Sequence, residues 1–166
     1  MLSFGIKTML YYVWTETGDY FNTPINAEGG KNPVWYGAQK FNHEFIAISP
    51  VYLQYNNIGA FTHNSENLSY AQMLYPLESF APIKEVKCDD ALLIGCFEKA
   101  EGEGYAFTVV NMSEMKLNKT VNVSLKLEGK TVTSYFGGEP QVMTPDANGY
   151  YTFELVCGDG VFITIG

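Results

Sequence analysis

From residue 83 onward the sequence consists of short apolar-rich segments of strand length, with turn residues between them. In Val121–Leu127 every second residue is valine or leucine, and the residues between them are polar. This period of two is typical of a strand with one buried and one solvated face. The strands predicted from the pattern are Ile83–Cys88, Ala91–Lys99, Tyr105–Asn111, Lys119–Leu127, Thr131–Phe136, Tyr150–Leu155 and Gly160–Ile165.

Glycine, asparagine and aspartate, the residues that tight turns need, separate these predicted strands. We expect turns at "EGEG", "GGEP", "DANG" and "CGDG", and hairpins at the last two. Two further extended segments, Val51–Tyr55 and Ala60–Thr62, precede this region, and residues 64–82 are expected to be mostly loop. Residues 51–166 are therefore predicted to form an antiparallel β-sandwich.

The first fifty residues follow a different pattern. Ile6–Val13, "IKTMLYYV", is almost continuously apolar, which is typical of a strand covered on both faces. After a loop, Asn32 and Pro33 are suited to the N-cap and the first position of a helix. The predicted helix covers residues 33–48 and ends at Ser49-Pro50. Its apolar face consists of Val34, Ala38, Phe41, Phe45 and Ile48.

The predicted fold class is accordingly mainly β, and α+β overall. An orphan strand–loop–helix unit over residues 1–50 precedes a β-sandwich domain over residues 51–166.

Composition narrows the range of ligands. The net charge is −8, and every basic side chain is lysine, so the planar arginine fork used for phosphates and base edges is missing. We therefore expect no nucleic-acid and no membrane partner, while neutral ligands stay open. Aromatic residues make up 15% of the chain, which suits either sandwich cores or sugar-binding surfaces.

Cysteine usage and sorting signals indicate the compartment. Cys88, Cys96 and Cys157 lack the spacing of a zinc site or a disulfide framework and are expected to be free thiols. No signal peptide is recognisable, so the predicted localisation is cytoplasmic and the sequons, one of them at Asn111, are read as chance. No cofactor is predicted and no metal site, since the two histidines, His43 and His63, have no third partner.

A strand–loop–helix unit that runs directly into a β-sandwich resembles the end of a (β/α)₈-barrel glycoside hydrolase. The group it looks most similar to is the β-galactosidase-like one of glycoside hydrolase families 42 and 35. The resemblance covers about the first 55 residues. The residues that carry it are Gly5, Lys7, Tyr12, Trp14, Asn26, Gly29, Pro33, Tyr36, Lys40, Asn42, Glu44 and Pro50.

The resemblance implies that Ile6–Val13 is the eighth barrel strand, buried by the barrel interior and the outer helices. Trp14 and Glu16 would then lie at the catalytic end of that strand, with Trp14 as a stacking platform for sugar; an ordinary core role for Trp14 is the alternative. The two catalytic carboxylates of this superfamily would lie upstream of Met1, so no catalytic residue is assigned here. The predicted sugar-contacting residues are Trp14, Glu16, Trp35 and Tyr36.

The sequence thus favours a non-catalytic C-terminal accessory part of a glycoside hydrolase that forms homo-oligomers through residues 1–50. One alternative is a free-standing carbohydrate-binding sandwich module, and another is a subunit that completes a separately encoded glycosidase barrel. The aromatic residues available to a binding module are Trp35, Tyr36, Tyr135, Phe136, Tyr150 and Tyr151. Because Tyr150 and Tyr151 are adjacent, only one of them can face a given side.

Overall fold

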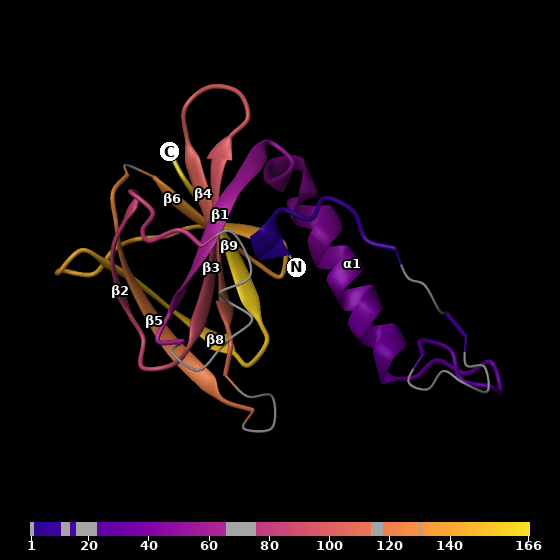
Figure 1. The fold of residues 1–166 in the computed structure, drawn as a ribbon. Helices are drawn as coiled ribbons and strands as arrows, with labels where there is room; N and C mark the ends of the chain where they lie inside the picture. Colours follow the sequence, from indigo (N-terminus) through magenta and orange to yellow (C-terminus); the bar gives the residue numbers. More distant parts are fainter. Residues whose placement is uncertain (1, 11–13, 16–22, 66–75, 114–117, 130) are drawn as a thin grey trace.

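The computed structural model describes residues 2–10, 14–15, 23–65, 76–113, 118–129 and 131–166. In this part of the chain, a short 3₁₀ turn η1 (Leu2–Phe4) and one helix α1 (Pro33–Tyr52) precede nine strands (Figure 1). The strands are β1 (Tyr55–His63), β2 (Ile83–Lys87), β3 (Leu92–Lys99), β4 (Tyr105–Asn111), β5 (Thr120–Leu127), β6 (Val132–Phe136), β7 (Glu139–Val142), β8 (Tyr150–Val156) and β9 (Gly160–Ile165).

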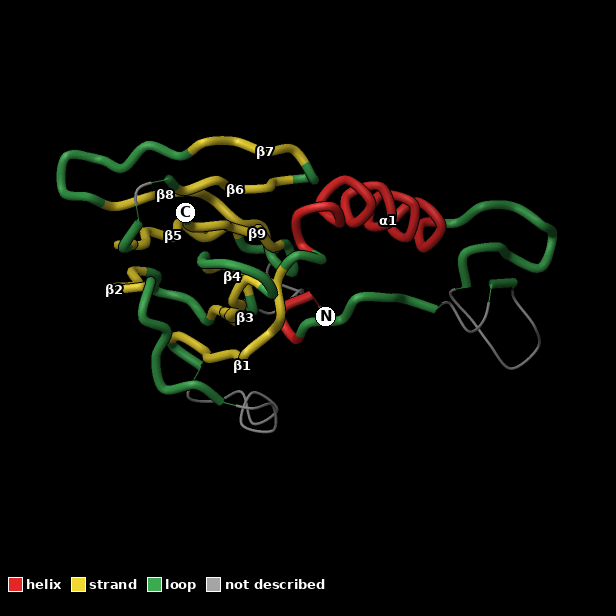
Figure 2. The backbone as a smooth tube through the Cα atoms, turned by 90° about the horizontal axis from the view of Figure 1, so that it is seen from above, coloured by secondary structure: helices red, strands yellow, loops and turns green. Residues whose placement is uncertain are grey.

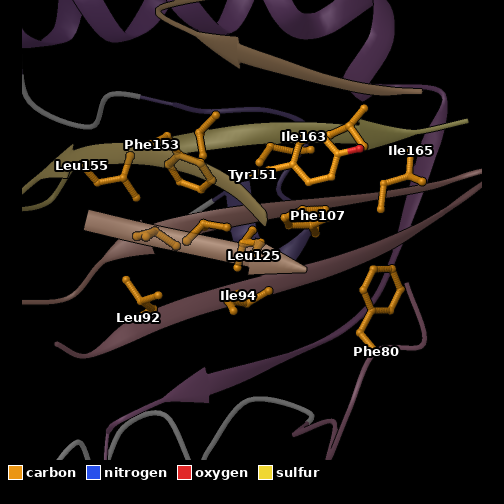
Figure 3. Packing of buried hydrophobic residues seen from close by; sticks show 14 of the residues in the cluster. Phe80, Leu92, Ile94, Phe107, Leu125, Tyr151, Phe153, Leu155, Ile163 and Ile165 are labelled. Atoms are coloured by element: carbon orange, nitrogen blue, oxygen red, sulfur yellow. The ribbon is translucent and has the colours of Figure 1, made fainter. Parts of the chain in front are cut away.

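The strands form two antiparallel sheets packed as a sandwich, as the alternation predicts. The larger sheet has the order β1-β3-β4-β9-β6-β7 and the smaller one β2-β5-β8. In the smaller sheet Val123 lies opposite Phe153 and Leu125 opposite Tyr151, with all four side chains turned into the core. Figure 3 shows this core, to which β3, β4 and β9 contribute Ile94, Phe107 and Ile163 among others.

The larger sheet is covered on its other face as well. Phe97, Ala106 and Phe162 point away from the sandwich core and pack with Ile48 and Tyr52 of α1 in a second cluster. This explains why β3 and β9 are almost continuously apolar, because a strand with two covered faces has no solvated side. The C-terminal half of α1 lies on this face, while its N-terminal half extends beyond the sandwich (Figures 1 and 2).

Tyr52 joins the helix, the sheet and the N-terminal turn. Its side chain is fully buried, and its ring contacts Phe45, Phe97 and Phe162 edge to face at centroid distances of 5.4–6.2 Å. Its hydroxyl donates to the carbonyl of Leu2 at 2.9 Å. Burial raises the pKa of Tyr52 to about 12, because the phenolate would lose its hydration.

Glycine at position 95 lets η1 lie directly on the larger sheet. A Cβ there would stand 2.2 Å from the carbonyl oxygen of Ser3, so no larger residue fits. Ser3 is buried, and its hydroxyl accepts a hydrogen bond of 2.8 Å from Thr108. The N-terminal turn is therefore part of the packed structure and not a loose end.

The predicted helix end at Ser49-Pro50 is wrong, because α1 continues to Tyr52. Proline cannot supply the amide that would bond the carbonyl of Ile46, but the Ser49 hydroxyl donates to that carbonyl at 2.9 Å. Burial of Tyr52 holds the last turn against the sheet. The extended segment predicted at Val51–Tyr55 is wrong for the same reason, and α1 crosses the predicted unit boundary at residue 50.

Three other predictions also need correction. Residues 6–10, the described part of the predicted strand Ile6–Val13, form no strand, and residues 11–13 lie outside the described residues. Of the "GGEP" sequence only Gly137 and Gly138 form the turn, since Glu139 and Pro140 belong to β7. Proline is tolerated in β7 because this strand lies at the edge of the sheet, where its missing amide has no partner to bond. The "DANG" and "CGDG" turns close no hairpins, because each joins strands of different sheets.

Candidate functional site

The loop before α1 brings two segments of the N-terminal region together. Asn32 caps the helix by accepting from the amide of Val34 at 2.9 Å. Just before it, the amide of Gly30 donates to the side chain of Asn26, which closes a tight turn. The amide of Ile25 then donates to the carbonyl of Trp14 at 3.0 Å. This bond and the ring contact with Trp35 place Trp14 beside the first turn of α1. Figure 2 shows that this turn is at the end of the helix far from the sandwich.

Trp14 and Trp35, called the tryptophan pair below, meet edge to face at a centroid distance of 5.2 Å. The Lys31 ammonium lies 4.4 Å from the centroid of the Trp35 ring, a cation–π contact. Trp14 is 40% exposed, so it is the accessible member of the pair. Two residues that the sequence named separately as sugar-contacting candidates thus lie in contact.

The indole N–H of Trp35 is buried and has no hydrogen-bond acceptor among the described residues. A buried donor without an acceptor costs about 1–3 kcal/mol, but this nitrogen has almost no accessible surface for a ligand oxygen. What the pair offers at its surface is an apolar aromatic face next to the ammonium group of Lys31. This combination suits a polyhydroxylated ligand that also has an apolar C–H face.

Of the other two predicted sugar-contacting residues, only Tyr36 lies in the described part of the chain. Tyr36 follows Trp35 on α1, where successive side chains point about 100° apart, and it is largely exposed. Glu16 lies outside the described residues, so its role stays a prediction.

The aromatic residues proposed for a binding module are dispersed. Tyr151 is buried in the sandwich core, and Phe136 packs on Phe153 at 5.8 Å. Tyr135 packs on Phe162 beneath α1. Tyr150 faces the outside of the smaller sheet, so the expectation that it and its neighbour face opposite sides is confirmed.

The surface around Tyr150 is already internally paired. The Lys87 ammonium lies 3.9 Å from the centroid of the Tyr150 ring. The Tyr150 hydroxyl donates to Glu85 at 2.7 Å, and this hydrogen bond lowers the pKa of the Glu85 carboxyl. A sugar stacking on this ring would have to displace the ammonium, so Tyr150 is a poorer platform than the tryptophan pair.

Among the described residues, no group of three or more histidine, cysteine or carboxylate side chains is arranged to hold a metal ion. The His63 ring bonds the carbonyl of Cys88 at 3.0 Å, and Cys96 is buried. In the described part of the chain no helix has the length and hydropathy to cross a membrane.

A comparison of this chain with protein-family models, with curated proteins and with solved structures gives no match.

Sequence reasoning missed Lys31 as a member of the site. Its contact with Trp35 has a sequence signal, because the two residues are four apart across the helix N-terminus. The turn that brings Trp14 to Trp35 has no such signal, since it depends on the pairing of Ile25 with both Thr15 and Lys31.

Proposed function

We propose that this chain is a non-catalytic accessory part of a glycoside hydrolase, in which the tryptophan pair contacts sugar and α1 packs against the enzyme's barrel. The observation that carries the proposal is the contact between Trp14 and Trp35 at the end of α1 that the sandwich leaves uncovered. The resemblance of residues 1–55 to the last unit of a β-galactosidase-like barrel supports the sugar as ligand class.

The uncovered apolar surface supports the second half of the proposal. Ile46 of α1 is 67% exposed and lies outside the cluster that packs on the sheet, and Leu10, in the segment before the helix, is 90% exposed. Val34 and Tyr36 are exposed near the helix start. Apolar side chains on two sides of one helix are typical of a helix with neighbours on both sides, as in a barrel's outer ring.

A tryptophan fluorescence titration tests the sugar contact. The chain has only two tryptophans, and both are in the pair, so their emission reports this site directly. We expect methyl β-galactoside to change the emission with a dissociation constant of about 1 mM, and Trp14→Ala to weaken binding about tenfold through the loss of about 1.4 kcal/mol of stacking. Calorimetry measures the same affinities without relying on the fluorophore.

Tyr150→Ala is the matched control, because it removes an aromatic ring from the opposite part of the molecule and should leave binding unchanged. Loss of binding in Tyr150→Ala with retention in Trp14→Ala would favour the free-standing binding module. If no sugar changes the emission at high millimolar concentration, the proposed role of the pair is wrong.

Without a barrel, the same apolar surface is expected to drive self-association through residues 1–50. Sedimentation equilibrium should then give a mass above the 18.5 kDa of one chain, and Leu10→Lys combined with Ile46→Lys should return it to that value. Val142→Lys on β7 is the control, since Val142 is 69% exposed, close to the 67% of Ile46, but belongs to the sandwich edge. A monomer at high concentration, or an oligomer that only Val142→Lys disrupts, would contradict this expectation.

A further inference from the structure

A cleft lies between the middle of α1 and the outer face of the larger sheet, and neither tryptophan lines it. It has a volume of about 230 Å³ and opens between the helix, the β6–β7 turn and the start of β9. We call it the helix–sheet cleft and define it by Phe41, Glu44 and Phe45 of α1 together with Tyr135, Asp159 and Phe162. Its size suits a ligand of about ten non-hydrogen atoms, smaller than the drug-sized molecules of most pockets.

Aromatic rings form much of the wall. Phe41 and Phe45 stack with their planes 12° apart and their centroids 5.9 Å apart, which gives α1 a continuous ring surface above the sheet. Tyr135 packs on Phe162 at 5.9 Å below it. These rings are held in place by contacts to each other and to Tyr52, so the cleft is formed before any ligand enters.

The β6–β7 turn fixes one end of the cleft by close approach to α1. A Cβ at Gly138 would stand 2.5 Å from the Cβ of Ala47, and Gly138 has a φ of +92°, which favours glycine. The adjacent Gly137 lies beside the Glu44 carboxylate. A Cβ added to Gly137 would stand 3.9 Å from the Oε1 atom of Glu44. The turn and the carboxylate therefore sit together at this end of the cleft.

The charge of the lining is negative. Glu44 and Asp159 are its ionisable acids, and the described lining contains no lysine, arginine or histidine. Lys40 lies 3.6 Å from Glu44 but is largely exposed, so solvent screens this pair. One oxygen of Asp159 accepts from the amide of Gly160, whereas Glu44 lies on α1 together with Phe41 and Phe45 and is therefore the carboxylate that shares an element with the aromatic wall.

We propose that the helix–sheet cleft binds a small organic ammonium compound, with its apolar body on the aromatic wall and its ammonium group at Glu44. A carboxylate beside aromatic ring faces is the combination that stabilises an ammonium group, through an ion pair and cation–π attraction. Anionic ligands are disfavoured by the lining and by the net charge of −8. The proposal is independent of the sugar contact, because none of the cleft residues belongs to the tryptophan pair.

Three probes of similar size test it: benzylamine, which is cationic at pH 7, its isostere benzyl alcohol, and the anion benzoate. Calorimetry on the intact chain should show saturable binding of benzylamine, at least tenfold weaker binding of benzyl alcohol and no binding of benzoate. Raising the salt concentration should weaken the binding of benzylamine but not that of benzyl alcohol. Amide chemical shifts should change for Gly137, Gly138 and Phe162, which lie around the cleft.

Glu44→Gln keeps the size of the side chain and removes its charge, and it should reduce benzylamine affinity about tenfold, to that of benzyl alcohol. Glu154→Gln is the control, because Glu154 is an exposed carboxylate of β8 outside the cleft and its loss should change nothing. Equal affinity for benzylamine and benzyl alcohol, unchanged affinity in Glu44→Gln, or shifts located elsewhere would overturn the proposal. Emission of the two tryptophans should stay constant throughout, which separates this site from the proposed sugar contact.

Discussion

Replacing Tyr52 with alanine is expected to lower the free energy of unfolding by about 3–5 kcal/mol, the usual cost of truncating a fully buried aromatic residue. The loss is large because one ring holds three parts of the structure together. It contacts Phe97 and Phe162 of the sheet and Phe45 of its own helix, and its hydroxyl binds η1. Urea denaturation followed by circular dichroism measures the change.

Tyr52→Phe is the control that separates the ring from the hydroxyl. It keeps the aromatic contacts and removes only the hydroxyl, which donates to the carbonyls of Leu2 and Ile6 at 2.9 and 3.3 Å, so it should cost about 1 kcal/mol. If Tyr52→Ala destabilises the protein no more than Tyr52→Phe does, then the ring does not hold α1 on the sheet and the packing described here is wrong.

The stability of the unmodified protein and that of Tyr52→Phe should depend differently on pH at alkaline pH. Burial raises the pKa of Tyr52 from 10 to about 12, so the folded state favours the neutral phenol. Its contribution is fully present below pH 10 and is lost as the pH rises toward 12, at up to about 1.4 kcal/mol per pH unit. Tyr52→Phe should lose stability less steeply in this window. Buried Cys96, whose pKa is also raised to about 12, affects both proteins equally.

The sandwich was predictable from the sequence because its signals are local. Strand positions follow from short apolar-rich segments between turn residues, and β4 and β9 have the predicted bounds. The order of the strands has no local signal, since a glycine turn such as "DANG" closes a hairpin or crosses to the other sheet with the same residues. The helix extension past Pro50 depends on a side chain bond from Ser49 and on burial of Tyr52, which are tertiary features.

The N-terminal region shows the opposite case, in which a strong local pattern does not give the expected element. Residues 6–10 are apolar enough for a buried strand but have no neighbouring strand among the described residues, and an unpaired strand is not stable in water. At the candidate site, tryptophan at positions 14 and 35 suggested sugar contact individually. Their meeting, and the contact with Lys31, required the turn that precedes α1.

Asn111 illustrates a polar residue whose role the sequence did not reveal. It begins a sequon, yet its side chain is only 1% exposed, so a glycan at this position is incompatible with the fold. Its amide group donates to the carbonyls of Lys119 and Leu155 at 3.1 and 3.0 Å. Its oxygen accepts from the amide and hydroxyl of Ser113 at 2.9 and 2.6 Å. Asn111 therefore joins β4 of the larger sheet to the segments that form the smaller one.

Asn111→Leu is expected to lower the free energy of unfolding by about 2–4 kcal/mol. Leucine has nearly the same shape but leaves the buried carbonyl of Leu155 and the groups of Ser113 without partners, at about 1–3 kcal/mol for a fully buried group. Asn122→Leu is the matched control, because Asn122 is exposed on β5 and its replacement should change stability by less than about 0.5 kcal/mol. Since two of the hydrogen bonds reach the segments of the smaller sheet and the other two hold Ser113 beside the end of β4, amide hydrogen exchange should speed up first in Ser113 and Leu155. Equal stability of the two variants would show that the apolar core alone aligns the sheets, and that the four bonds of Asn111 add nothing to it.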